Sequence, residues 1–466
     1  MTRNPSGGSQ PSAGHPDHTG PAGHPGPSTA LLTDHYELTM LRAALRSGAA
    51  HRRAVFEVFA RYLPVGRRYG VIAGTGRLLD ALRRFRFGGE ELEFLRAAGV
   101  ADEATLSYLE SYVFTGDIWG YAEGDCYFPG SPILVVEGTF AEAVILETLI
   151  LSILNHDCAI AAAASRMVTA ADGRPLIEMG SRRTHELSAV ASARAAYLTG
   201  FASTSNLQAG RDYGVPTSGT SAHAFSLVHH NERQAFAAQL AALGQGTTLL
   251  VDTFDVAAAV RTAVELAGDQ LGAVRIDSGD LPVVARQVRG MLDSLGARRT
   301  RIVLTGDLDE HSIAALAATP VDGYGVGTAL VTGSGAPTAA LVYKLVARAQ
   351  DDAVSAPLHP VAKRSVGKPG RGGRKWALRH RDVSGAAAAE LVMTEPPVPA
   401  PDDRVLLHQL VRGGEIVGGE PLEAARARHR EALAELPVHA LQLSRGYPAI
   451  PTVFGPDASA AAYSEG

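Results

Sequence analysis

The chain has 466 residues, 46% hydrophobic and 20% charged, with a net charge of −5 and a pI near 6.4. These values are typical of a soluble globular protein and argue against nucleic-acid or anionic-membrane binding, which favours excess positive charge. The two cysteines, Cys126 and Cys158, are too few for a disulfide framework or a thiolate metal site. We therefore expect a reducing, cytoplasmic location.

The first thirty residues consist largely of Gly, Pro, Ser and His. They lack the continuous apolar core of a signal peptide, and their composition favours a disordered tail over a metal-binding segment. We expect folded sequence to begin near Leu31.

Residues 31–140 are expected to form an N-terminal α/β domain. The pair Asp34 and Glu37 has the spacing of a helix start, and Gly48 is placed to end that helix. Strands are predicted over 54–60 and 133–138, with a helix-rich region between them up to about residue 112.

The longest apolar stretch, residues 132–154, contains Glu137, Glu142 and Glu147. Three carboxylates would be costly inside a bilayer, so this stretch predicts a buried strand and helix and no membrane span. We expect one long buried helix from residue 141 to about residue 171.

From residue 175 onward, short apolar runs ending in polar residues or glycine alternate with alanine-rich helical segments. Strands that alternate with helices indicate a parallel sheet with right-handed crossovers. Seven such units predict an irregular seven-stranded β/α barrel over residues 141–350, and an open doubly wound sheet is the alternative. The predicted strands are 175–180, 201–206, 215–219, 248–253, 273–278, 301–307 and 323–327.

The pattern changes after residue 346. A basic, glycine-rich segment over 363–382 precedes further strands and a charged helix near 421–435. Residues 360–445 are expected to return to the N-terminal domain, which would then be discontinuous, and residues 446–466 to form a loosely packed tail.

Polar side chains follow nearly every predicted barrel strand. In a β/α barrel the C-terminal ends of the strands meet at one mouth, where the chemistry takes place. Arginines, hydroxyls, carboxylates and glycine turns together suit a phosphorylated, anionic substrate with a divalent metal. The set is Arg182, Arg183, Thr184, Ser203, Thr204, Ser205, Asn206, Thr217, Ser218, Thr220, His223, Asp252, Arg275, Asp277, Ser278, Asp280, Asp307, Gly325, Gly327 and Thr328.

Two short motifs in this set each allow two readings. GYGVGT offers backbone N–H groups at Gly325 and Gly327 and the Thr328 hydroxyl, which suits a phosphate, although tight turns without ligands share the pattern. In VRIDSGD, strand alternation places Arg275 and Asp277 on one face. This pair can bind substrate, or it can be an ion pair that seals the barrel.

His223 lies among small and hydroxyl residues in GVPTSGTSAHAF. A neutral imidazole there is a candidate nucleophile for a phosphoryl group, with acidic strand ends such as Asp252 available to orient it. The alternative is a hydrogen-bonded core histidine.

Several blocks occur in an order that resembles the nicotinate phosphoribosyltransferase family. They are LLTDHYELTM, VVEGTFAEAVILETLILSILN, EMGSRRTHE, AAYLTGFASTSNLQAG, GVPTSGTSAHAF, VRIDSGDL and GYGVGTALVTGSGAPTAALVYKLV. The resemblance runs from about residue 31 to about residue 379, and the set is specific although no single block is.

The resemblance implies a type II phosphoribosyltransferase, with an irregular barrel of about seven strands and a discontinuous second domain. Such enzymes join nicotinate to 5-phosphoribosyl 1-diphosphate, release nicotinate mononucleotide and diphosphate, and couple the reaction to ATP hydrolysis. The family forms homodimers with a shared active site and uses Mg²⁺. No nucleic acid or membrane partner is implied.

The family's roles can be assigned to residues by motif. His223 would be transiently phosphorylated by ATP, and Tyr36 would stack on the pyridine ring from a partner subunit. Thr220 and Arg275 would bind nicotinate, Arg275 through the carboxylate. The hydroxyl that often follows the family's histidine is absent here, because position 224 is Ala.

The remaining assignments concern 5-phosphoribosyl 1-diphosphate. Thr328 would bind the 5-phosphate, with Gly325 and Gly327 shaping the turn. Arg182 and Asp277 would contact the diphosphate, the ribose or the metal.

Three alternatives differ in substrate or activity. Quinolinate-using relatives are much shorter, and a catalytically silent homologue is disfavoured because the motif set is complete. A nicotinamide-using enzyme differs by as little as one side chain that distinguishes amide from carboxylate.

Overall fold

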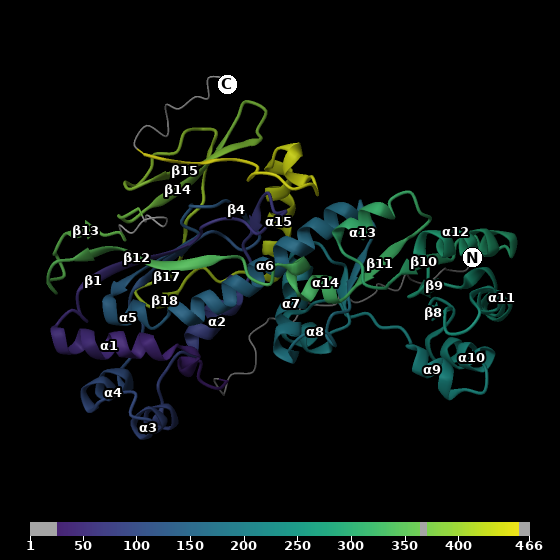
Figure 1. Cartoon of the computed structure of the whole chain (residues 1–466), viewed down its shortest axis with the longest axis horizontal. Helices are drawn as coiled ribbons and strands as arrows, with labels where there is room; N and C mark the ends of the chain where they lie inside the picture. The colour runs from purple at the N-terminus through teal and green to yellow at the C-terminus, as the bar shows by residue number, and fades with distance from the viewer. Residues whose placement is uncertain (1–25, 364–370, 456–466) are drawn as a thin grey trace, which may run out of the picture.

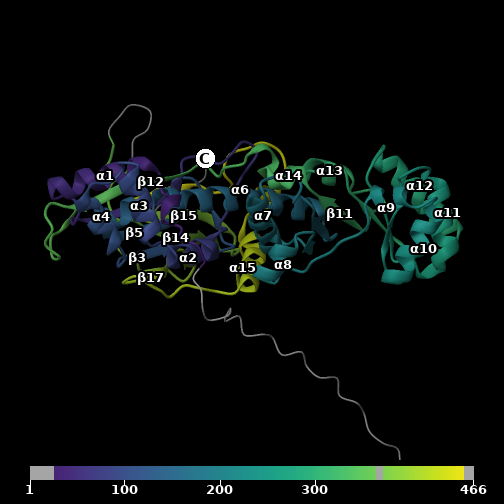
Figure 2. The same ribbon diagram turned by 90° about the horizontal axis from the view of Figure 1, so that it is seen from below.

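The computed structural model describes residues 26–363 and 371–455. The molecule is elongated, with antiparallel sheets and the first helices at one end and a parallel sheet with its helices at the other (Figure 1). The long helix α6 (Glu147–Ala171) runs between them, and the view from below shows the same arrangement (Figure 2).

The largest sheet is antiparallel and combines early and late segments of the chain. Its interior strand β1 pairs with β12 along seven residues and with β5 on its other side. Residues 341–349, expected in the barrel, therefore belong to this sheet as β12. In spatial order the strands are β13 (Leu358–Pro360), β12 (Leu341–Ala349), β1 (Arg53–Ala60), β5 (Leu134–Thr139), β3 (Asp117–Gly120), β17 (His408–Arg412) and β18 (Glu415–Ile416).

Five helices accompany this sheet. The helix predicted from Asp34 begins at His35 and is capped by Gly48 in the left-handed region, at φ 76°. Glu37 does not form the expected box; its buried carboxylate accepts hydrogen bonds from Thr33 and Thr148 instead. The helices are α1 (His35–Ser47), α2 (Thr75–Arg83), α3 (Gly89–Ala97), α4 (Glu103–Glu110) and α5 (Phe140–Val144), with a 3₁₀ turn at Ala30–Leu32.

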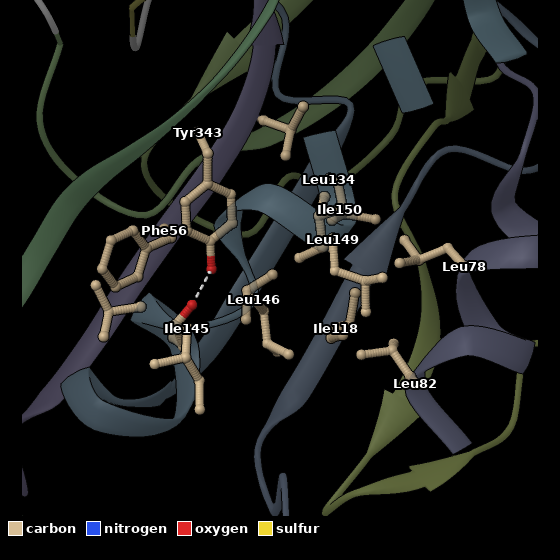
Figure 3. Packing of buried hydrophobic residues seen from close by; sticks show 14 of the residues in the cluster. Phe56, Leu78, Leu82, Ile118, Leu134, Ile145, Leu146, Leu149, Ile150 and Tyr343 are labelled. Atoms are coloured by element: carbon tan, nitrogen blue, oxygen red, sulfur yellow. Dashed lines mark hydrogen bonds between the residues drawn. The ribbon is translucent and has the colours of Figure 1, made fainter. Parts of the chain in front are cut away.

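The core between sheet and helices contains closely packed aromatic and aliphatic side chains (Figure 3). Phe56 of β1 stacks on Tyr343 of β12, with ring centroids 4.8 Å apart. The Tyr343 hydroxyl donates a 2.8 Å hydrogen bond to the carbonyl of Ala143 in α5. Strands from both ends of the sequence are thereby joined to α5.

The single long helix predicted over 141–171 is two helices, α5 and α6, separated at Ile145 and Leu146. The break is stabilised because carbonyls at the end of α5 find partners outside the helix. The carbonyls of Glu142, Ala143 and Ile145 accept hydrogen bonds from the side-chain hydroxyls of Tyr112, Tyr343 and Thr33, respectively.

By length and composition, the segment Phe140–Ala171 is the one stretch within the described residues that could cross a membrane, and 61% of its most apolar window is buried inside the protein. Its Leu149 and Ile150 pack against the antiparallel sheet, whereas its Ile160 and Met167 pack near the parallel sheet. The segment is thus part of both hydrophobic cores, in agreement with the predicted buried helix.

The parallel sheet has six strands, so the seven-stranded barrel is not confirmed. Segment 215–219 contributes only an isolated parallel bridge from Thr217 to Thr204. No ladder between described residues joins that bridge to β8 at the opposite edge. The order is β7 (Ser203–Thr204), β6 (Leu176–Glu178), β11 (Gly323–Val326), β10 (Arg301–Leu304), β9 (Ala273–Ile276) and β8 (Thr248–Leu250).

Helices alternate with these strands as the sequence pattern predicts, and neighbouring strands are parallel. A parallel α/β architecture with a curled sheet is confirmed. The helices are α7 (Glu186–Thr199), α8 (Leu207–Tyr213), α9 (His223–Val228), α10 (Glu232–Leu243), α11 (Val256–Ala267), α12 (Leu281–Ser294), α13 (Glu310–Ala315) and α14 (Thr328–Val331), with 3₁₀ turns at Gly268–Gln270 and Gly333–Gly335.

The C-terminal part forms a small sheet and a helix that packs on α7. The sheet has the order β16 (Asp403–Val405), β14 (Trp376–Arg381), β15 (Ala387–Met393) and β19 (Thr452–Phe454). The helix is α15 (Leu422–Glu435), followed by a 3₁₀ turn at Val438–Leu441. A two-stranded sheet pairs β2 (Gly70–Val71) with β4 (Cys126–Tyr127).

Both predicted tails lie partly outside the described residues, which begin at 26 and end at 455. In the described part of the N-terminal tail, Thr29 and Ala30 are buried, and the Thr29 hydroxyl donates to the carbonyl of Ala81 at 2.7 Å. Ala449 and Ile450 are buried as well, and β19 pairs with β15. Residues 449–454 are therefore packed rather than loose, because they complete the small sheet.

Candidate active site

The nicotinate residues predicted from the sequence meet beside strand β9. Arg275, on that strand, donates from Nη1 to Thr220 Oγ1 at 2.6 Å and to the carbonyl of Ser221 at 3.3 Å. Its side chain is 13% exposed, and Nη2 lies 3.8 Å from Asp277 Oδ2. The guanidinium group is therefore held against the 214–222 loop with Nη2 not engaged in a short contact.

His223 is the first residue of α9 and is partly exposed at the same mouth. Its Nδ1 lies 3.2 Å from the Thr253 hydroxyl, and its Nε2 lies 3.9 Å from Asp277 Oδ2. The Thr253 hydroxyl therefore orients the imidazole ring of His223, and the prediction that Asp252 orients it is wrong. A hydroxyl can donate or accept, so it allows the neutral imidazole that a nucleophile requires.

Asp277 links two neighbouring strand ends. Its Oδ1 accepts a 2.5 Å hydrogen bond from Thr305, which follows β10. Asp252 Oδ2 supports it from the other side by accepting from the Asp277 backbone N–H at 2.9 Å and the Ser278 hydroxyl at 2.7 Å. Asp252 is therefore a structural support for the Asp277 turn.

The predicted phosphate residues lie at the ends of β6 and β11, which pair with each other. Thr328 is exposed at the start of α14, and Arg182 is exposed in the turn after β6. A side chain at Gly325 would come within 2.5 Å of Thr305 Cγ2 and 2.7 Å of Met179 Sδ, so close packing requires glycine there. Gly327 lies at the turn, where a Cβ would be 3.4 Å from the Met179 carbonyl oxygen.

Tyr36 lies apart from the other predicted site residues. It is on α1 and 46% exposed, and α1 lies at the opposite end of the molecule from α9 in both views (Figures 1 and 2) and from β9 in Figure 1. The structure therefore brings together His223, Thr220, Arg275 and Asp277, and it does not bring Tyr36 to them within one chain.

Three functional positions were missed from sequence: Thr253, Thr305 and Glu178. Thr253 and Thr305 follow strands, and that position was their only signal. Glu178 is a lone carboxylate within the apolar run PLIEMG, and the structure buries it completely. An ionisable residue inside a predicted buried strand is the signal that could have found it.

No cluster of three or more His, Cys, Asp or Glu side chains able to hold a metal ion occurs in 26–363 and 371–455. Asp277 Oδ2 has no hydrogen bond within those ranges, so one carboxylate oxygen at the mouth is free to coordinate a metal ion. This donor set fits a Mg²⁺ ion that arrives bound to a diphosphate and does not fit a resident metal centre.

Glu232, the first residue of α10, provides a pH-dependent prediction. Burial, together with the negative charges of Asp252 and Asp255, raises the pKa of Glu232 to about 7. The folded-state pKa is above the ordinary value, so the stabilising contribution of this group is complete at low pH and is lost as the pH rises through about 7.

We expect Glu232→Gln to melt at the same temperature as the wild type near about pH 4, below the ordinary pKa of a glutamate, and at a higher temperature near about pH 8. Thermal unfolding at both pH values measures the difference, with the exposed Glu431→Gln as control. A difference that does not change with pH would contradict the assignment.

The fold and this mouth are those of an α/β enzyme that handles an anionic, phosphorylated substrate. Comparison with known proteins identifies the family. A model of the nicotinate phosphoribosyltransferase (NAPRTase) N-terminal domain matches residues 31–155, and the NAPRTase family model matches residues 175–385. The chain belongs to the nicotinate phosphoribosyltransferase family.

Individual relatives are similar to this chain over most of its length. A nicotinate phosphoribosyltransferase of Mycobacterium tuberculosis, pncB1, is 59% identical over 449 residues, which cover 94% of this chain and 96% of that protein. That of Bacillus subtilis is 36% identical over 341 residues, covering 70% and 68%. The crystal structure of human nicotinic acid phosphoribosyltransferase has a TM-score of 0.78 at 26% identity, covering 92% and 98%.

Proposed function

We propose that this protein is a nicotinate phosphoribosyltransferase that joins nicotinate to 5-phosphoribosyl 1-diphosphate and couples the transfer to ATP hydrolysis through His223. The products are nicotinate mononucleotide and diphosphate, and the reaction opens the salvage of nicotinate to NAD. The observation that carries the proposal is the cluster of Arg275, Thr220, His223 and Asp277 at one mouth.

The pyridine is assigned to the Arg275 side of the mouth. A carboxylate requires a cation with several donors, and Arg275 supplies one beside the Thr220 hydroxyl. The carboxylate then sets the direction of the ring nitrogen. A neutral amide would offer no charge to Arg275 Nη2, which would keep only its 3.8 Å contact with Asp277, and this difference favours nicotinate over nicotinamide.

The transfer requires the bond between ribose C1 and the diphosphate oxygen to break. The electron pair of that bond leaves with diphosphate, and the ring nitrogen lone pair forms the new bond to C1. Mg²⁺, when bound with the substrate diphosphate, would neutralise the charge of the leaving group. We assign Asp277 to the ribose or the metal-bound diphosphate, and Arg182 and Thr328 to the phosphates.

ATP hydrolysis is coupled through a phosphoryl group on the imidazole. A ring nitrogen of His223 forms a bond to the γ-phosphorus, and the bond to the ADP oxygen breaks. Water later releases phosphate from the ring. The partial exposure of His223 and its hydroxyl partner Thr253 support this role, since the neutral ring has a lone pair available.

A homodimer accounts for the position of Tyr36. Because this residue lies at the far end of its own chain, a second copy must supply it if it stacks on the pyridine (Figure 1). We also propose that the six strands and the Thr217 bridge act as an irregular seven-stranded barrel. The side chains of Arg275 and Thr253 support closure of the barrel, because they contact the 214–223 segment. Among the described residues, that segment has no strand ladder with β8 or β9.

The test is incubation with γ-labelled ATP followed by measurement of acid-labile, base-stable protein phosphate. The wild type is expected to be labelled, and His223→Asn to fall to background while it retains slow transfer without ATP. His230→Asn, an exposed histidine nearby, is the matched control and should be labelled fully. Full labelling of the His223→Asn variant would overturn the phosphohistidine.

A further inference from the structure

Glu178, the last residue of β6, is fully buried, and no Lys or Arg within the described residues pairs with it. Burying a carboxylate is costly unless hydrogen bonds compensate. Two short ones do so here: Oε1 accepts from the Gly180 backbone N–H at 2.5 Å, and Oε2 accepts from the Thr204 hydroxyl at 2.5 Å.

These bonds belong to a closed ring that connects two strand ends. The Thr204 hydroxyl, which donates to Glu178, accepts from the Asn206 backbone N–H at 2.9 Å. Asn206 in turn donates from Nδ2 to the Ser181 hydroxyl at 3.0 Å. Ser181 follows Gly180, so the turn after β6 is bound at two successive residues.

The same turn is packed against the predicted phosphate residues of β11 and α14. Met179 donates from its backbone N–H to the carbonyl of Val326 at 2.8 Å. A Cβ at Gly180 would overlap Val331 of α14 and would lie 3.2 Å from the Gly327 carbonyl. Any shift of the Gly180 turn therefore displaces the 326–331 segment or is blocked by it.

Arg182 lies in the same turn, two residues after Gly180. The turn closes when the Arg183 backbone N–H donates to the Gly180 carbonyl at 2.8 Å. The position of Arg182 relative to Thr328 thus depends on the backbone of the Gly180 turn, and the Glu178 carboxylate binds that backbone through the Gly180 N–H.

We propose that Glu178 is a positioning residue that fixes the Arg182 turn against Gly327 and thereby sets the affinity for 5-phosphoribosyl 1-diphosphate. This inference rests on the proposed function of the mouth. Glu178 itself touches no substrate. Within the described part of the chain, the proposed nicotinate ligands, Arg275 on β9 and Thr220 in the 214–222 loop, make no hydrogen bond with Glu178, so nicotinate binding should be much less affected.

The first test is Glu178→Gln, which preserves volume but cannot accept both hydrogen bonds in the same way. We expect the KM for 5-phosphoribosyl 1-diphosphate to rise by about tenfold and the KM for nicotinate by less than about twofold. Glu186→Gln, at an exposed carboxylate on the first residue of α7, is the control and should match the wild type.

A second pair of variants covers the case in which Glu178→Gln does not fold. Thr204→Val removes the hydroxyl and should raise the same KM, whereas Thr204→Ser should restore it. A double-mutant cycle with Arg182→Ala should show effects that are less than additive, because both act through one turn.

Equal changes in both KM values, or additivity in the cycle, would overturn the inference. An inactive wild type would refute the proposed function instead, so the two failures are distinguishable.

Discussion

Arg275→Lys is expected to raise the KM for nicotinate by roughly 10-fold to 100-fold while changing the KM for 5-phosphoribosyl 1-diphosphate by no more than about twofold. Nη1 of Arg275 is bound to Thr220, so Nη2 remains to meet a carboxylate. A lysine ammonium is a point charge that cannot hold the loop and the substrate in the same planar arrangement.

Initial rates with each substrate varied in turn measure the two KM values. Arg286→Lys, exposed on α12, controls for the loss of a guanidinium elsewhere. Equal losses for both substrates would show that Arg275 is not the nicotinate ligand.

The largest expected effect on stability is at Arg379 of β14, which is fully buried. Its Nη2 donates to Glu390 Oε1 at 2.6 Å and to the carbonyl of Cys126 at 2.8 Å. Arg379→Met leaves the buried Glu390 carboxylate without its cation. Breaking a buried pair in this way costs about 3–5 kcal/mol, so the melting temperature should fall by several degrees.

The double variant Arg379→Met with Glu390→Leu should recover much of the loss, because an apolar pair can replace a buried ion pair. Arg233→Met, from the exposed pair with Glu265, should change stability little. A single Arg379→Met variant as stable as the wild type would contradict the assignment.

The parallel half of the fold could be predicted because its strands lie in short apolar runs that end in polar residues or glycine. Strand alternation likewise placed Arg275 and Asp277 together, as the 3.8 Å contact confirms. The antiparallel half could not be derived in this way, since β1 pairs with β12 nearly three hundred residues later. Such pairings are set by tertiary contacts, and local periodicity carries no information about them.

The mouth was predicted in its members but not in its internal bonds. Thr253 and Thr305 are small hydroxyl residues at strand ends, and many such residues in this chain bind nothing in the site. Which hydroxyl faces His223 or Asp277 depends on the curl of the sheet and the path of the 214–222 loop. The structure brings His223, Thr220, Arg275 and Asp277 together, but the roles of these residues remain predictions, as do those of Tyr36, Thr328 and Arg182, because all of them concern ligands or a second copy.

Helix α6 contributes side chains to both hydrophobic cores, with Leu149 in one and Met167 in the other. The two ends of the molecule consequently share one structural element instead of being tethered by a linker. Neither end can open fully without uncovering apolar surface that belongs to the other. Unfolding of one end is therefore expected to expose apolar surface of the other, so the two ends should unfold together.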